Sequence, residues 1–368
     1  MNDRDPRRLG VATQERVRQA VHERVFGAAR DPVRIGRYTV LKRIGQGGMG
    51  VVYAAYDTEL DRKVALKLLH FERDESAHGQ RLVREAKALA KLSHPSIVAV
   101  HEVGEHDGNV FVAMEFVDGD TLREYVEKRP LDWREIVGLY VQAGRGLAAA
   151  HAVGLVHRDF KPDNALVSDG RHADHASARV RVLDFGLARE LGDREHLGGA
   201  ASGPSAHAVA LTQTGALLGT PAYMAPEQYA GAAVDAHADQ FAFCVSLWEA
   251  LYRERPFDDT SVASVAQAIR VGRRRAAPTD TKVPAALHRV LERGLELRPV
   301  DRFSSMVELV DTLGALLDAD RRGRMGLAIV VTGLALVIGG WVWIGREREH
   351  TSRADTLAGE AAVEHARA

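Results

Sequence analysis

The chain has little of what marks secreted or nucleic-acid-binding proteins. Its single cysteine, Cys244, cannot form a disulfide within the chain, which favours an intracellular location for most of it. The 49 Lys and Arg residues nearly cancel the 50 Asp and Glu residues, so the basic excess that binds nucleic-acid phosphates is absent. Residues 1–8 are charged and lack the apolar core of a signal peptide. We therefore expect a largely intracellular protein with no nucleic-acid partner.

A glycine-rich turn is predicted near the start of the ordered chain. Residues 38–41 and 51–56 are rich in β-branched and aromatic residues, and each is expected to form a strand. Between them, Gly45, Gly47 and Gly50 follow the spacing G-x-G-x-x-G. Because a strand follows the last glycine, these glycines are expected at a hairpin tip, where backbone N–H groups can approach phosphates. A tight hairpin without a ligand is the alternative.

Lys67 interrupts the apolar strand predicted over residues 64–69, and it would need an anionic partner if it is buried. Residues 81–92 have helical periodicity, and Glu85 lies on the apolar face of that helix. A carboxylate on an apolar face is unusual unless a cation meets it. We therefore expect Glu85 to pair with Lys67, and a Glu85 that reaches solvent is the alternative.

The densest group of chemically useful side chains lies in residues 157–164. Pro162 has no backbone N–H and disfavours a helix here, so the run is predicted to be a rigid loop. Such a loop can direct Asp159 and Asn164 to one point, with Lys161 between them. Phosphoryl transfer needs an acceptor for a hydroxyl proton, a metal ligand and a cation. An ordinary polar surface turn is the alternative.

Other segments indicate a second lobe. Residues 110–117 are predicted to form an apolar strand that ends at a turn, and we place a lobe boundary there. Residues 180–183 are predicted to form a strand followed by Asp184, which puts a carboxylate at the strand edge where it can hold a metal. Residues 239–251 are apolar nearly all round, which predicts a buried helix.

Six motifs that occur in one order resemble those of eukaryotic-like protein kinases. They are Gly45-x-Gly47-x-x-Gly50-x-Val52, Val64-Ala65-Leu66-Lys67, Glu85, His157 to Asn164, Asp184-Phe185-Gly186 and Ala225-Pro226-Glu227. The resemblance covers residues 34–317. It implies a bilobal α+β protein kinase fold, with a β-rich small lobe that carries one long helix and a mainly helical large lobe. It also implies ATP as a cofactor, together with Mg²⁺ or, in its place, Mn²⁺.

The resemblance implies the catalytic roles. Asp159 would accept the proton of the substrate hydroxyl, and Lys161 would offset charge on the moving γ-phosphoryl group. Lys67 would hold the α- and β-phosphates of ATP and would be oriented by Glu85.

The same resemblance implies the binding and structural residues. Asn164 and Asp184 would hold Mg²⁺. Glu227 would pair with Arg302, and this pair would have a structural role. Thr220 would also be structural and would lie near residues 157–164, the catalytic loop. The expected nucleotide site comprises Ile44, Gly45, Gln46, Gly47, Gly48, Met49, Gly50, Val51, Val52, Ala65, Lys67, Met114, Glu115, Val117 and Leu166.

The motifs also indicate the class of substrate. Lys161 and the segment 219–227 resemble the serine/threonine branch of the family, and details of the glycine run resemble its bacterial members. We therefore expect protein substrates with Ser or Thr acceptors. A catalytically inactive kinase-fold scaffold is one alternative, although the lysine, base and metal ligands that inactive relatives usually lack are present. A small-molecule kinase is the other, and the Ala225-Pro226-Glu227 motif argues against it.

The long segment between Gly186 and Ala225 resembles an activation loop. We expect phosphorylation of Thr212 or Thr214, by autophosphorylation between associated copies of the chain, to order the loop through Arg158. Ordinary solvated threonines are the alternative.

A membrane-spanning helix is predicted at 325–344, a run without charge that is long enough for the roughly 30 Å hydrocarbon layer. Because a kinase needs ATP, the kinase domain would lie in the cytosol, with a single pass through the inner membrane of a bacterium. From there it would take part in signal transduction. We expect an N-terminal extension (1–33), a small lobe (34–117), a large lobe (118–317), a basic linker (318–324), the span (325–344) and an extracytoplasmic tail (345–368).

Overall fold

The computed structural model describes residues 33–47, 50–69, 89–168, 178–185, 221–257 and 261–322. The chain divides into two compact units, Met1–Gly314 and Ala315–Ala368. Residues 306–314 are helical at the end of the first unit, and the described part of the second unit, residues 315–322, is helical as well.

The predicted membrane span at 325–344 and the predicted tail at 345–368 lie outside these ranges. Within the described ranges, no helix is both long and apolar enough to cross a membrane.

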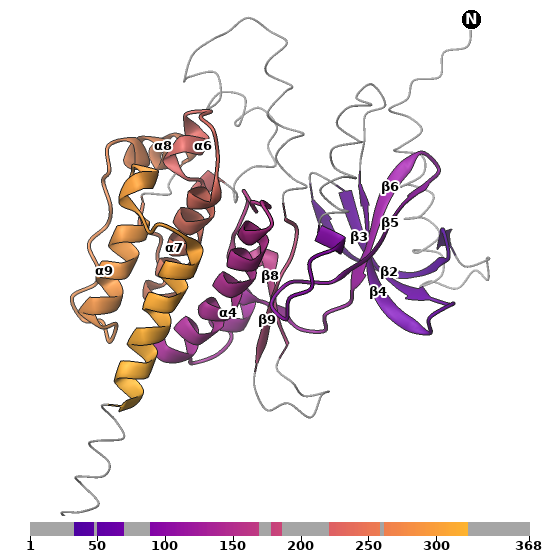
Figure 1. The fold of residues 1–368 in the computed structure, drawn as a ribbon, viewed down its shortest axis with the longest axis horizontal. Helices are drawn as coiled ribbons and strands as arrows, with labels where there is room; N and C mark the ends of the chain where they lie inside the picture. Colours follow the sequence, from indigo (N-terminus) through magenta and orange to yellow (C-terminus); the bar gives the residue numbers. More distant parts are fainter. Residues whose placement is uncertain are drawn as a thin grey trace, which may run out of the picture. The chain divides into compact units, whose positions relative to one another are not determined.

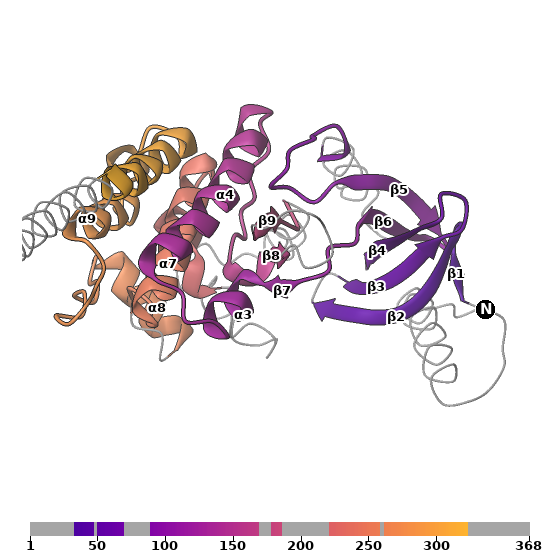
Figure 2. The same ribbon diagram turned by 90° about the horizontal axis from the view of Figure 1, so that it is seen from below.

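The first unit begins with a six-stranded antiparallel sheet in the order β1-β2-β3-β4-β6-β5 (Figure 1, Figure 2). Its strands are β1 (Arg34–Ile35), β2 (Tyr38–Gly47), β3 (Gly50–Asp57), β4 (Arg62–Leu69), β5 (Val100–His106) and β6 (Asn109–Glu115). The strands that we expected at 38–41, 51–56, 64–69 and 110–117 are therefore confirmed. β-branched and aromatic residues dominate them because such side chains pack well on a pleated surface.

Alternation along β4 separates two clusters of side chains. Leu66 and Leu68 join the core on one face of the sheet, together with tyrosines of β2 and β3. Ala65 and Leu69 belong to a cluster on the opposite face. Successive side chains of a strand point to opposite faces, so Lys67 lies on the same face as Ala65 and Leu69.

Helices and a small sheet form the rest of the described part of the first unit (Figure 1). Besides the helical residues 306–314, the helices are α3 (Leu122–Glu127), α4 (Trp133–Ala152), α6 (Pro226–Tyr229), α7 (Ala236–Tyr252), α8 (Val262–Arg270) and α9 (Ala285–Gly294). Short 3₁₀ turns are η1 (Pro162–Asn164), η2 (Pro221–Tyr223) and η3 (Pro299–Asp301). The small antiparallel sheet has the order β7-β8-β9, with β7 (Asp120–Thr121), β8 (Ala165–Ser168) and β9 (Arg179–Val182).

Helix α7 is central to this part of the unit. Both α4 and α9 pack against it, and nearly all of its side chains are buried. This confirms the buried helix predicted at 239–251, since a helix that is apolar all round must be covered on every side.

Strand β9 is tied to the segment that precedes β5. The backbone N–H of Val98 donates to the Val182 carbonyl oxygen at 3.0 Å, and that of Val182 donates to Ser96 at 2.9 Å. These bonds fix the position of β9, and therefore of Asp184, which follows it.

Candidate active site

Residues 157–164 lead from the end of α4 to β8, and α7 holds the first part of this loop. Asp239 of α7 is 1% exposed and accepts hydrogen bonds from the backbone N–H groups of His157 at 2.7 Å and Arg158 at 2.8 Å. Arg158 has a φ of +64°, a left-handed conformation that is costly for a residue other than glycine. A buried acid therefore fixes a strained backbone immediately before Asp159.

The imidazole of His157 connects the loop to the segment around Asp184. It is fully buried, and its Nε2 lies 2.7 Å from the carbonyl oxygen of Leu183. Its ring packs against Phe160 and Phe185. Because Leu183 and Phe185 flank Asp184, the loop and this carboxylate are held together by one buried side chain.

Asp159, Lys161 and Asn164 converge as predicted. Lys161 Nζ lies 3.1 Å from Asp159 Oδ2. Asn164 Nδ2 donates to the Asp159 carbonyl oxygen at 2.7 Å and to Oδ2 at 3.3 Å. The run ends in a 3₁₀ turn and not in an irregular loop, because Pro162 occupies the first helical position, where its missing N–H costs no hydrogen bond.

Lys67 is 5% exposed, and its Nζ lies 2.7 Å from Asp184 Oδ1. Asp184 thus supplies the anion that a buried lysine needs, whereas the predicted partner Glu85 lies outside the described residues. Burial raises the pKa of Asp184, but the charges of Lys67, His157 and Lys161 outweigh this effect, and the pKa lies below its ordinary value. Asp184 therefore presents a carboxylate anion.

Asn164 and Asp184 offer the oxygen ligands that Mg²⁺ and Mn²⁺ prefer. The Nδ2 group of Asn164 donates to Asp159, so its amide oxygen can coordinate a cation. The two residues are neighbours, because the N–H of Leu183 donates to the Asn164 carbonyl oxygen at 2.8 Å. In the part of the chain that the structure describes, no cluster of three or more His, Cys, Asp or Glu offers another metal site. The predicted pair therefore fits the metal.

Four residues of the predicted nucleotide site gather in the apolar cluster on the Lys67 face of the sheet. Ala65 and Met114 belong to its apolar cluster, and Val52 and Val117 pack against them. Two further residues of the predicted site lie in strands: Glu115 ends β6 of the same sheet, and Leu166 lies in β8 of the small sheet.

The glycine run forms the β2–β3 hairpin, as predicted, and Gly47 pairs with Gly50 at its described end. At Gly50, φ is +152°, and an added Cβ would lie only 2.0 Å from the carbonyl oxygen of Leu68. Only glycine fits there, so the hairpin can lie close against β4. Ile44 is 45% exposed beside the glycines, in a position to cover a ligand.

Comparison with known protein families matches residues 38–313 to the protein kinase domain. The chain belongs to the protein kinase family.

Its relatives include "Probable serine/threonine-protein kinase PknB" of Lactococcus lactis, at 35% identity over 78% of this chain and 43% of that protein. They also include "Serine/threonine-protein kinase PknD" of Mycobacterium tuberculosis, at 37% identity over 75% of this chain and 39% of that protein. The chain spans less than half the length of these curated relatives. The solved kinase domain of Mycobacterium tuberculosis PknI superposes with a TM-score of 0.57 and 28% identity, covering 78% of this chain and 99% of that one. These relatives are bacterial, and the two curated ones are named as serine/threonine kinases.

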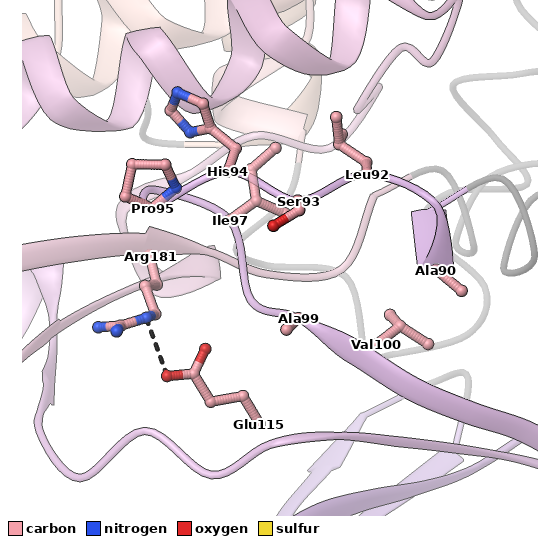
Figure 3. A pocket seen from close by; sticks show the side chains of 10 residues that line it. All are labelled: Ala90, Leu92, Ser93, His94, Pro95, Ile97, Ala99, Val100, Glu115 and Arg181. Carbon is pink, nitrogen blue, oxygen red and sulfur yellow. Dashed lines mark ion pairs between the residues drawn. The ribbon is translucent and has the colours of Figure 1, made fainter.

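A cavity of about 360 Å³ (Figure 3) has none of the residues 157–164 in its lining. It is lined by residues between 90 and 100 and by Glu115 and Arg181, whose side chains form an ion pair at 3.0 Å. Of the predicted site residues that the structure describes, only Glu115 lines this cavity. It is therefore not the expected nucleotide site.

The structural pair expected of a kinase large lobe is present. Both terminal nitrogens of Arg302 contact the Glu227 carboxylate, at 2.7 and 2.8 Å. The Arg302 side chain is 0% exposed and also donates to the carbonyl oxygens of His237, Glu296 and Leu297. The pair connects α6, which contains Glu227, with α7 and with the segment that follows α9.

Several predicted residues lie outside the described part of the kinase. They are Gly48, Met49, Glu85, Thr212, Thr214 and Thr220. Their roles, and that of Arg158 as a sensor of phosphate, stay predictions.

Sequence reasoning missed Asp239, which holds the catalytic loop. A signal was available, because an acid in the first turn of a buried and mainly apolar helix needs hydrogen-bond partners.

Proposed function

We propose that this chain is a serine/threonine protein kinase, a phosphotransferase that moves the γ-phosphoryl group of ATP to Ser or Thr hydroxyls of proteins. The observation that carries the proposal is the convergence of Asp159, Lys161 and Asn164, with Asp184 tied to the same loop and paired with Lys67. These groups match the acceptor, cations and oxygen ligands that phosphoryl transfer needs. The names of the relatives support Ser and Thr acceptors.

In this reaction Asp159 accepts the proton of the substrate hydroxyl. Lys161, 3.1 Å from Asp159, offsets charge on the transferred group. Lys67 contacts the α- and β-phosphates, and Asn164 and Asp184 are the residues that would hold Mg²⁺. When bound, the metal would neutralise charge on the phosphate oxygens.

The proposal includes activation by phosphorylation of Thr212 or Thr214 between two copies of the chain. Arg158 follows His157 directly and precedes Asp159, so a phosphate that binds it would act on the loop backbone. The double variant Thr212→Ala/Thr214→Ala should lose most of its activity and its own phosphorylation. Full retention of both would exclude this mode of activation.

The proposal also places residues 325–344 in the inner membrane as a single span, with the kinase domain in the cytosol. It is supported by the uncharged run of residues, by Trp341 and Trp343 near one end, and by arginines on both sides.

The proposed function is tested by incubating the purified chain with labelled ATP, Mg²⁺ and a generic protein substrate. We expect phosphoserine and phosphothreonine on the substrate and on the chain itself, and loss of nearly all labelling in Lys67→Met. A folded wild type that transfers no phosphate yet binds partners would favour the scaffold. Labelling of small molecules alone would favour a small-molecule kinase.

A further inference from the structure

Arg123, in the first turn of α3, contacts side chains from three other elements. Its Nε lies 3.0 Å from Asp163 Oδ1, and its Nη2 lies 2.9 Å from Asp163 Oδ2, a bidentate pair. The same Nη2 donates to the hydroxyl of Tyr223 at the end of η2. Its Nη1 lies 3.2 Å from Glu249 of α7. One guanidinium therefore joins α3, η1, η2 and α7.

The partners of Arg123 also contact one another. The hydroxyl of Tyr223 donates to Glu249 Oε2, and Arg255 Nε donates to Glu249 Oε1 at 2.9 Å. The guanidinium of Arg255 lies 5.1 Å from the centre of the Tyr223 ring. Two arginines thus face two carboxylates around one phenol, so the charges balance. Such connected networks hold their members more rigidly than separate ion pairs do.

The pKa shifts in this network keep its hydrogen bonds intact. Burial lowers the pKa of Arg123, but Asp163, Tyr223 and Glu249 more than compensate, and the pKa lies above its ordinary value. Burial, followed by the charge of Glu249, raises the pKa of Tyr223. The guanidinium stays charged and the phenol keeps its proton at any physiological pH.

Asp163 is the residue through which the network reaches the catalytic loop. It lies between Pro162 and Asn164 in η1, and Asn164 in turn donates to the backbone and carboxylate of Asp159. A displacement of Asp163 would therefore move both the metal-ligand candidate and the base. Asp163 is 45% exposed and Arg123 23% exposed, so their attraction alone contributes little to stability. The geometry suits the fixing of a position better than the stabilisation of the fold.

We propose that Arg123 is a positioning residue of the kinase reaction: it holds η1, and through it Asn164 and Asp159, in register with η2 and α7. This inference rests on the proposed function. Arg123 acts on the loop and not on the contacts with nucleotide. Its removal therefore lowers the rate of phosphate transfer and does not change the binding of ATP.

The test compares Arg123→Ala and Arg123→Lys with Lys128→Ala, each made in the whole 368-residue chain. Lys128 is a matched control, because it is a cation at the end of the same helix whose partners are Asp120 and Glu124. We expect kcat of Arg123→Ala to fall about 10- to 100-fold while KM for ATP changes less than about twofold. Arg123→Lys keeps the charge but not the bidentate geometry, so its kcat should lie between that of wild type and that of Arg123→Ala. Millimolar guanidinium should restore part of the activity of Arg123→Ala only.

A second measurement does not depend on activity. Amide hydrogen exchange across residues 159–166 should be faster in Arg123→Ala than in wild type, and unchanged in Lys128→Ala. The inference is overturned if Arg123→Ala has the kcat of wild type. It is also overturned if the activity that Arg123→Ala loses is not restored by guanidinium and is accounted for by a lower thermal stability of the variant. An inactive wild type would refute the proposed function. Even with an inactive wild type, faster exchange in Arg123→Ala but not in Lys128→Ala would support the positioning of the loop by Arg123. Unchanged exchange in Arg123→Ala would refute that positioning.

Discussion

Two side chains contact the carboxylate of Asp159, and both contact the same oxygen. Lys161 and Asn164 both contact Oδ2, at 3.1 and 3.3 Å. Oδ1 is therefore oriented by these contacts and can accept the proton of an incoming hydroxyl. Because Lys161 contacts one carboxylate oxygen, Asp159 can lie beside this lysine and still use the other oxygen as a base.

Lys67 shows the limit of reasoning from residue types. Its place in an apolar strand predicted an anionic partner, and a buried lysine with such a partner is found. The identity of the partner depends on which segments fold against the sheet, which periodicity does not reveal. The carboxylate that pairs with Lys67 in the described residues is Asp184, 117 residues along the chain.

Cys244 gives a direct test of burial at the residue scale. It is 0% exposed, and burial raises the pKa of its thiol to about 12. Since the thiolate is the reactive form, the folded protein should not react with an aromatic disulfide reagent at pH 8, whereas unfolding in urea should release one reactive thiol per chain. Rapid reaction of the native protein would show that α7 is not covered as described.

At the scale of elements, runs of β-branched, aromatic and apolar residues predicted the main strands and the buried helix, because such runs directly reflect burial. They did not predict how closely these elements approach. An added Cβ at Gly294 of α9 would lie 2.2 Å from the sulfur of Cys244, so α7 and α9 pack at a distance that only glycine allows. Such contacts join residues far apart in the chain and leave no local pattern.

The Glu227–Arg302 pair provides a test at the element scale. Glu227→Ala should lower the free energy of unfolding by about 3–5 kcal/mol, because it leaves a buried arginine without its anion. Arg298→Ala, which breaks an exposed pair with Asp301, is the control and should cost less than about 1 kcal/mol. Urea unfolding of both variants measures the difference. Equal effects of the two substitutions would contradict the structural role of Glu227.

At the scale of the whole molecule, the family match spans residues 38–313, and the catalytic and structural groups described above lie within it. The order of the motifs predicted this domain because each motif has a chemical role that restricts its residue types. The network around Arg123 could not be predicted in the same way, since its members come from four separate elements.

The proposed membrane topology predicts the accessibility of the chain's two ends. In intact cells, a cysteine introduced in the tail 345–368 should react with a reagent that does not cross the inner membrane. A cysteine introduced within 1–33 should react only after lysis, because the kinase domain must share a compartment with ATP. Protection of the tail in intact cells would show that it is cytosolic and would refute the proposed topology.

The central claim is that Asp159 is the base of a phosphoryl transfer. The most direct measurement is the single-turnover rate of phosphate transfer from ATP to protein for wild type and Asp159→Asn, with equal thermal stability and ATP affinity as controls. The asparagine keeps the size and the contacts of the side chain but cannot accept the proton. The account predicts a rate at least about 100-fold lower in Asp159→Asn. A folded variant that binds ATP and transfers phosphate within a few-fold of the wild-type rate would contradict it.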